Sequence, residues 1–393
     1  MRVLIAGGGI GGLTAALALL EHGIDVDVYE QAAELKEVGA GVQLAANGSR
    51  VLYALGIGEE LKALSCVAQG KEIRHWQTGE AWKLFDLGPV SIERYGAPYF
   101  TVYRPDLLEV LARALRRAKP DALHLGARGR GFVQDDDSVT LQLENGVSAR
   151  GDALIGADGV HSRIRQSLFG PDRAEFTGFI AWRGMVPTAQ LPAHMARRVG
   201  SNWVGPGGHV VHYPLRAGRL MNFVGARERA DWRVESWSAR GTQDELAVDF
   251  RGWHADIQAF IRAIDAPYKW ALMVRRPLER WSVGRVTLLG DAAHSMLPFL
   301  AQGAVMAIED GYVLARCLAG DPVETALQRY EAARRERTRR TVEGSAANIH
   351  RFHNRALADP EDGRRFIDQE WASQRIAERY EWLFRYDATT VEI

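Results

Sequence analysis

The first thirty residues alternate between apolar runs and polar positions in the order of a strand, a helix and a second strand. The apolar run at 3–6 predicts a buried central strand, and the leucines between 13 and 20 recur at helical spacing. The stretch 25–30 then alternates apolar and polar residues and ends in an acid. This pattern predicts a parallel β-α-β unit at the start of the chain.

The turn between the first strand and the helix is rich in glycine. It satisfies G-x-G-x-x-G with Gly7, Gly9 and Gly12. Such glycines allow a tight turn and a close backbone approach, and the N-terminus of the following helix meets a pyrophosphate. Glu30 ends the second strand at about the 20-residue distance expected of a carboxylate that accepts ribose hydroxyls. The unit therefore predicts dinucleotide binding, and by itself it fits FAD and NAD alike.

Two later segments also run from an apolar strand through a tight turn into a helix. Residues 153–165 contain an Asp158-Gly159 turn, for which ordinary turn chemistry is the plain interpretation. Residues 285–298 pass through Gly290-Asp291, and an apolar helix follows them from about residue 303. Each segment alone is moderate evidence for a nucleotide site.

A short strand at 209–214 places two titratable side chains on one face. Because side chains alternate along a strand, His209 and Tyr213 point one way and His212 points the other. A histidine and a tyrosine on one face suit acid–base work on a phenol or a hydroxypyridine. The plain alternative is a half-exposed strand with a satisfied histidine, and the residues alone leave both interpretations open.

Taken together and in this order, the three motifs G-x-G-x-x-G, D-G and G-D resemble those of the flavoprotein aromatic hydroxylases, the single-component class A monooxygenases. The resemblance covers nearly the whole chain and is nearest to the branch of salicylate 1-hydroxylase, 3-hydroxybenzoate 6-hydroxylase and 6-hydroxynicotinate 3-monooxygenase. Many relatives have glycine where Ala301 stands, a departure that narrows the subfamily. The branch-like stretches are Gly39-Ala40-Gly41-Val42, Tyr103-Arg104-Pro105-Asp106-Leu107, Ala181-Trp182-Arg183-Gly184 and Ala301-Gln302-Gly303.

The resemblance implies an α/β fold: a Rossmann-like FAD-binding domain of the glutathione-reductase type, as in p-hydroxybenzoate hydroxylase, with a mostly antiparallel substrate sheet and C-terminal helices. The substrate region is rich in alternating strands and tryptophans, among them Trp232 and Trp237. The expected parts are a discontinuous FAD-binding domain at 1–70, 100–175 and 270–330, a substrate domain at 71–99 and 176–269, and a C-terminal helical region at 331–393.

The resemblance also implies how non-covalent FAD is held. Glu30 would hold the adenosine ribose, and Arg104, as a fixed cation, would reach the pyrophosphate or the ribityl chain. Asp158 would lie near the pyrophosphate and Asp291 would bond the ribityl chain. At a helix N-terminus, the N–H groups of residues 303 and 304 would stabilise the reduced flavin. The expected cofactor set is Gly7, Gly9, Gly12, Glu30, Gly41, Val42, Arg104, Asp158, Asp291, Gly303 and Ala304.

For the substrate, the resemblance implies that His209 accepts a proton and that Tyr213 hydrogen-bonds the ring substituents. The related hydroxynicotinate and hydroxybenzoate enzymes place an active-site histidine and tyrosine at this same interval. Pro298 would lie beside the carbon to be oxidised, and Gln43 would lie near flavin and substrate. Arg183 is either a clamp for a substrate carboxylate or part of a structural ion pair.

The implied activity is hydroxylation of a small phenolic or hydroxy-heteroaromatic substrate, carboxylated as salicylate or 3-hydroxybenzoate are. NADH or NADPH and O2 would be consumed through a flavin hydroperoxide, whose chemistry belongs to the cofactor. Because the chain has no second G-x-G-x-x-G, the nicotinamide would visit transiently. A flavin oxidase or dehydrogenase on the same scaffold and a non-catalytic flavin-binding redox sensor stay open as alternatives.

The composition of the chain excludes several classes of partner and of fold. The 49 basic and 49 acidic residues cancel, which argues against nucleic-acid or anionic-membrane partners. Two cysteines cannot form a disulfide framework, and no apolar run near the start approaches the ~20 residues of a membrane span. We therefore expect a cytoplasmic monomer or homodimer.

Two polar groupings near the C-terminus carry no function in this interpretation. The run at 334–340 is rich in arginine but contains Glu336, so it predicts a solvated helix face and not a nucleic-acid contact. His350 and His353 stand three apart on a predicted helix without an assignable third ligand, so no metal is expected.

Overall fold

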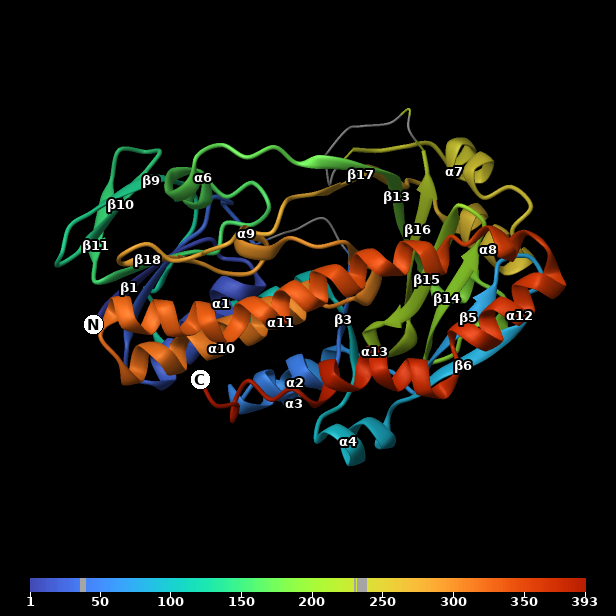
Figure 1. The fold of residues 1–393 in the computed structure, drawn as a ribbon, viewed down its shortest axis with the longest axis horizontal. Coiled ribbons are helices and arrows are strands. Elements are labelled where there is room, and N and C mark those ends of the chain that lie inside the picture. The colour runs from blue at the N-terminus through green and yellow to red at the C-terminus, as the bar shows by residue number, and fades with distance from the viewer. Residues whose placement is uncertain (36–39, 230, 232–238) are drawn as a thin grey trace.

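A computed structural model describes residues 1–35, 40–229, 231 and 239–393. Gly39, Trp232 and Trp237, which the sequence interpretation singled out, lie outside the described residues. Two large sheets divide the described chain, and a long helix runs beside both of them (Figure 1).

The first large sheet is parallel and contains the N-terminal strand at its centre. Residues Val3 to Ala6 of that strand are buried, because helices cover one face of the sheet and a smaller three-stranded sheet packs on the other, which leaves no face open to solvent. The β-α-β unit predicted from the hydrophobic pattern is confirmed, and strands from the two later motif segments lie on its other side. In sheet order the strands are β18 (Val286–Leu288), β12 (Ala153–Gly156), β1 (Arg2–Ala6), β2 (Asp25–Tyr29) and β8 (Leu123–His124).

The second large sheet has seven strands and is antiparallel except where β14 pairs with β5. One face packs against α7 and α8 through aromatic side chains, and the other faces the C-terminal helices. The expected domain boundary at 269/270 falls inside its edge strand β17. In sheet order the strands are β17 (Tyr268–Val274), β13 (Glu175–Pro187), β16 (Leu220–Glu228), β15 (Gly208–Leu215), β14 (Val199–Gly205), β5 (Gly70–His75) and β6 (Ala81–Asp86).

Two three-stranded antiparallel sheets complete the strands that the structure describes. The first joins the glycine-loop half of the molecule to the seven-stranded sheet, and the second packs on one face of the parallel sheet (Figure 1). They consist of β3 (Gly41–Leu44), β7 (Phe100–Tyr103) and β4 (Cys66–Val67), and of β11 (Ser148–Gly151), β10 (Val139–Leu143) and β9 (Gly129–Gln134).

Helix α11 is 30 residues long and passes from the parallel sheet to the seven-stranded sheet, with α10 packed along its first half (Figure 1). Of the helices in the described part of the chain, none combines the length and the apolar character that crossing a membrane would take. The α-helices are α1 (Ile10–Glu21), α2 (Ala46–Ala54), α3 (Gly58–Leu64), α4 (Pro89–Tyr95), α5 (Arg104–Ala118), α6 (Arg163–Phe169), α7 (Gln243–Asp249), α8 (Ala255–Ala263), α9 (Asp291–His294), α10 (Gly303–Gly320), α11 (Val323–Phe352), α12 (Pro360–Glu370) and α13 (Ser373–Arg385).

Candidate functional site

The glycine loop is packed too tightly for side chains at two of its three fingerprint positions. A Cβ on Gly7 would lie 2.2 Å from the carbonyl oxygen of Ala157, and one on Gly12 would lie 2.0 Å from the oxygen of Gly7. A Cβ on Gly9 would meet nothing within 4 Å, so that residue faces open space. Gly9 is also the N-cap of α1 and offers no side-chain cap, which leaves the first N–H groups of the helix available to an anion.

Glu30 ties the end of β2 to this loop. Its Oε2 accepts a 2.7 Å hydrogen bond from the Gly8 N–H, and its Oε1 accepts one of 2.8 Å from the Ala32 N–H. A carboxylate has about four acceptor positions, so two remain for further donors such as hydroxyl groups.

Asp158 caps the start of α6. It accepts hydrogen bonds from the N–H groups of Arg163 and Ile164 at 2.7 Å and 3.2 Å, and from the hydroxyl of Ser162. Burial raises the pKa of this carboxyl group. The turn chemistry expected of an Asp-Gly pair is therefore present. The turn follows β12 as the glycine loop follows β1 and Asp291 follows β18, so all three motifs meet at the carboxyl edge of the parallel sheet.

The G-D segment leads to a second open helix N-terminus. Asp291 is exposed and makes no hydrogen bond to the described residues. Gln302, the N-cap of α10, places no side chain over the first turn, so the N–H groups of Gly303 and Ala304 are not capped by it. Just before it, Ala301 adopts φ +55°, a left-handed conformation that costs an L-residue about 1–2 kcal/mol. That cost explains why glycine suits this position.

Strand β3 connects the nucleotide edge to the seven-stranded sheet. The Gly41 N–H donates a 2.9 Å hydrogen bond to Oδ1 of Asn222, and a Cβ on Gly41 would lie 2.7 Å from the Tyr213 hydroxyl oxygen. On its other side, the Arg104 N–H donates to the carbonyl of Ala40 at 2.8 Å, which places the start of α5 beside the start of β3. Val42 follows, half-buried, between Gly41 and Gln43.

The alternation predicted for 209–214 is confirmed in β15, whose register with both neighbours is unbroken. Tyr213 lies against β3, whereas the His212 ring packs against Phe260 on the opposite face at 4.8 Å. His209 shares the face of Tyr213. At about 3.3 Å per residue the two are about 13 Å apart along the strand, which leaves room for one aromatic ring between them.

His209 pairs with a histidine that the sequence did not connect to it. Its Nδ1 and Nε2 of His353 share a 2.6 Å hydrogen bond, and its ring packs edge-on against Phe299 at 4.8 Å. Burial first, and then the neighbouring His353, lower the pKa of His209 well below its usual value. Burial also lowers the pKa of His353 to about 3. Both rings are therefore neutral at pH 7. Pro298, exposed, stands directly before Phe299.

A polar cluster surrounds the Tyr213 end of this face. The Tyr99 hydroxyl donates a 2.9 Å hydrogen bond to Oε1 of Gln43, and the Lys71 ammonium lies 3.5 Å from the same hydroxyl. Arg183 is held over the rings of Tyr268 and Trp270, at 5.4 Å and 5.2 Å. The sequence interpretation identified Gln43 and Arg183 but missed Lys71 and Tyr99. The strand pattern around 70–75 has charged residues on both faces, so it gave no signal for Lys71.

A buried ion network joins α10 and α11 to His294 at the end of α9, next to the G-D segment. Nε of Arg334 donates a 2.7 Å hydrogen bond to Asp310, whose other oxygen bonds Nε2 of His294 at 2.6 Å. Arg334 also pairs with Glu309 at 2.7 Å. The solvated face expected for 334–340 is therefore only half right, because Arg334 and Arg337 point inward. The remaining links are Arg337 to Glu309, Asn47 to Glu309 and Asn47 to Gln302, at 2.7 Å, 2.7 Å and 3.0 Å.

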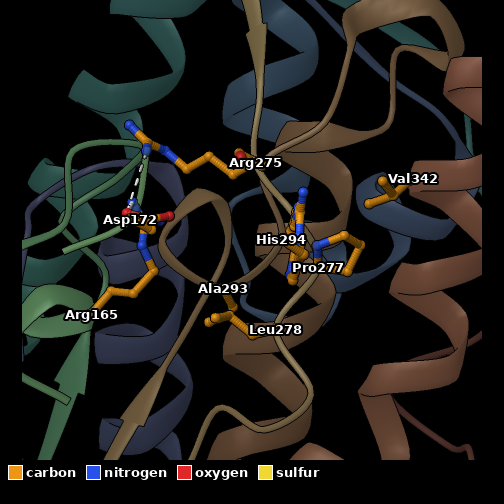
Figure 2. Close-up of a pocket in the computed structure, with 10 residues that line it drawn as sticks. Arg165, Asp172, Arg275, Pro277, Leu278, Ala293, His294 and Val342 are labelled. Atoms are coloured by element: carbon orange, nitrogen blue, oxygen red, sulfur yellow. Dashed lines mark hydrogen bonds and ion pairs between the residues drawn. The ribbon is translucent and has the colours of Figure 1, made fainter. Parts of the chain in front are cut away.

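A small cavity borders the same segment (Figure 2). Figure 2 shows Arg165 and Arg275 on either side of Asp172, and each donates to the same carboxylate oxygen at 3.3 Å. The volume of about 10 Å³ accommodates roughly one water molecule and no aromatic ring. We therefore place the candidate substrate site on the face of the seven-stranded sheet. Within the described part of the chain, no three His, Cys, Asp or Glu side chains gather as a metal site.

Known proteins resemble this chain over nearly its whole length. Residues 1–345 match the family model described as FAD binding domain. The chain is 38% identical to a 3-amino-4-hydroxybenzoate 2-monooxygenase of Streptomyces platensis, covering 99% of this chain and 97% of that protein. It is 36% identical to 3-hydroxybenzoate 6-hydroxylase of Polaromonas naphthalenivorans, covering 98% and 96%. Among solved structures, Klebsiella pneumoniae HpxO complexed with FAD and uric acid matches with a TM-score of 0.80 at 30% identity, covering 96% of each chain.

Proposed function

The chain belongs to the FAD binding domain family, and from that membership we propose that it hydroxylates a small aromatic ring bearing a hydroxyl group and a carboxylate, with NADH or NADPH and O2 as co-substrates. One observation carries the proposal. The nucleotide edge of the parallel sheet and the His209–Tyr213 face of the other sheet are joined by β3, where Gly41 contacts both Tyr213 and Asn222. The names of the two hydroxybenzoate relatives support the substrate class.

The residues present fit FAD. The open helix N-terminus at Gly9 would hold the pyrophosphate, and Glu30 would hold the adenosine ribose. Asp158, which fixes the turn before α6, would lie near the pyrophosphate. Exposed Asp291 and half-buried Arg104 would reach the ribityl region. The N-terminus of α10 at Gly303 would face the pyrimidine edge. Gly7 and Gly12 keep the turn closed, and Gly41, Val42 and Ala304 complete the cofactor set.

When bound, FAD takes a hydride from the nicotinamide and activates O2 for transfer to the ring. The chain's own residues do the rest. Neutral His209 accepts the proton of the substrate hydroxyl, and Tyr213 hydrogen-bonds the ring substituents from the other end. Pro298 and Phe299 shape the site beside His209, and Gln43, fixed by Tyr99, lies between β3 and the substrate. Deep burial of this face excludes water from the reacting groups.

The activity is tested with aromatic acids and hydroxypyridines offered with NADH or NADPH under labelled O2. We expect a yellow protein that releases intact FAD on acid precipitation, NAD(P)H oxidation stimulated by the correct aromatic, and labelled oxygen in the product. An oxidase or dehydrogenase would leave the product unlabelled. A redox sensor would show no stimulated turnover. A colourless protein that FAD cannot reconstitute would contradict the cofactor assignment.

Replacing Glu30 with alanine should weaken FAD binding by about 1.5–3 kcal/mol, the contribution of a hydrogen bond to a charged group. The change removes both the expected ribose contact and the anchor on the Gly8 N–H. The dissociation constant of FAD measures it by fluorescence titration of the apoprotein. Asp25→Ala, at the opposite end of β2, is the matched control and should bind FAD as the wild type does. An unchanged constant in Glu30→Ala would show that Glu30 does not touch the ribose.

Two finer features of the proposal concern the state of the protein in the cell. We propose a cytoplasmic protein, because both cysteines, Cys66 and Cys317, are buried and unpaired, which suits a reducing compartment. We also propose that it is a monomer or a homodimer. Light scattering of the purified holoenzyme measures the mass directly, and a mass above that of two chains would contradict the proposed assembly.

A further inference from the structure

Lys71 occupies the same face of the seven-stranded sheet as Tyr213. It stands opposite Gly200 of β14, and a Cβ on that glycine would lie 3.8 Å from Cε of Lys71 and 3.9 Å from Cβ of Tyr213. Lys71 and Tyr213 therefore border the same glycine on this face of the sheet. The neighbouring carboxylate of Glu72 points to the opposite face, where it bonds Arg74, Arg197 and Ser201.

No carboxylate among the described residues pairs with Lys71. Its polar neighbour is the Tyr99 hydroxyl at 3.5 Å, and that hydroxyl already donates to Gln43. Burial lowers the pKa of Lys71 to about 8. A buried ammonium without an anion is unfavourable, and a bound anion would relieve that cost. Part of the side chain surface nevertheless remains accessible.

We propose that Lys71 binds the carboxylate of the aromatic substrate, which fixes the ring with its anionic group at the Tyr213 end of the face and its hydroxyl group at the His209 end. This deepens the proposed function and rests on it. The distance of about 13 Å between His209 and Tyr213 along the strand separates the two ends. Arg183, the other cation on this face, is already held over two aromatic rings.

The test compares Lys71→Met with the wild-type holoenzyme. The probes are 3-hydroxybenzoate, 4-hydroxybenzoate, salicylate and 3-amino-4-hydroxybenzoate, each paired with its neutral amide, and the perturbation of the flavin spectrum gives each dissociation constant. For the acid that the wild type binds most tightly, we expect Lys71→Met to weaken binding by about tenfold or more, with the amide changed less than about twofold. Lys83→Met, a lysine on the exposed side of neighbouring β6, is the control and should change neither constant.

A loss that is equal for acid and amide, or absent from both, would overturn the proposal, as would wild-type preference for the amide. Those outcomes leave the proposed function intact if the wild type still hydroxylates an aromatic. If no probe, acid or amide, stimulates NAD(P)H oxidation in the wild type, the proposed function itself fails.

The pH dependence gives a second readout. Because the free amine has a pKa of about 8, the affinity of the wild type for the acid should fall as the pH rises from about 7 to about 9. In Lys71→Met the affinity should stay flat over that range. The other titratable groups on this side keep one protonation state over that range. Burial raises the pKa values of Tyr99 and Tyr213, which stay protonated, and lowers those of His75, His209 and His353, which stay neutral. Arg183 also lies on this face, over its two aromatic rings. A pH profile that Lys71→Met retains would overturn the assignment.

Discussion

Replacing His209 with alanine should slow hydroxylation by about 10²–10⁴-fold, the usual cost of removing a general acid–base group, while FAD affinity stays close to that of the wild type. The reason is geometric. For Nε2 of His209 to accept a substrate proton, its own proton must reside on Nδ1 and be donated to Nε2 of His353, 2.6 Å away. The lowered pKa of His209 keeps the ring neutral and ready for that role.

His212→Ala is the matched control, because it removes the same ring from the opposite face of the same strand. That ring packs on Phe260, so the variant loses packing there but no group that reaches the proposed substrate. Single-turnover measurement of product formation separates the chemical step from substrate binding. If His212→Ala loses hydroxylation while His209→Ala keeps it, the assignment of the catalytic face is reversed.

The His209 pairing shows what strand alternation does and does not reveal. Period-two alternation by itself predicts that His209 and Tyr213 share one face and that His212 lies on the other, and β15 confirms it. It carries no information about His353, because that contact joins residues 144 apart in the chain. In the sequence, His353 stands three residues from His350 on a predicted helix, and that spacing gives no indication of a hydrogen bond to β15.

The motif segments show the same division. The glycine loop, Glu30 and the two later turns are local signals, since each needs only a strand, a turn and a helix in sequence order, and all three lie at one sheet edge in the structure. Lys71 and Tyr99 are different. Lys71 contacts the Tyr99 hydroxyl, and that hydroxyl contacts Gln43, only because β5, β3 and the residue before β7 come together in the fold. No spacing in the sequence predicts that arrangement.

For the arginine-rich run at 334–340, the sequence did not indicate which side chains are buried. Arg334 and Arg337 share one side of α11 with buried Thr341, while Arg335 and Arg339 point to solvent. Helical spacing allows such a division. The buried arginines pair with Glu309 and Asp310, which lie on a different helix, α10. In the sequence of α10 these two acids are ordinary polar positions, so they do not indicate a buried ion network.

Arg334→Met should lower the free energy of unfolding by about 3–5 kcal/mol, because it leaves two buried carboxylates with too little positive charge. Arg334 is fully buried and pairs with both Glu309 and Asp310 at 2.7 Å. The matched control is Arg339→Met, the same substitution on the exposed side of the same helix, where an ion pair contributes about 0–1 kcal/mol. Urea unfolding at one fixed excess of FAD measures both variants, with the FAD dissociation constants determined separately, since bound FAD itself adds stability.

The same variant should also respond to pH in the opposite sense from the wild type. Burial opposes ionisation of Asp310, but His294 and Arg334 outweigh it and hold the pKa of Asp310 below its usual value; Arg337 and Arg334 do the same for Glu309. In the wild type this stabilisation is complete above the ordinary carboxyl pKa and is lost only as the pH falls through the lowered values. Without Arg334, burial dominates and raises these pKa values, so a carboxyl group takes up a proton on mild acidification and the folded state recovers. The stability deficit of Arg334→Met should therefore be largest near pH 7 and shrink toward about pH 5. A deficit that stays the same from pH 7 to pH 5 would show that Arg334 stabilises the fold by packing alone, and not by compensating the buried charge of Glu309 and Asp310.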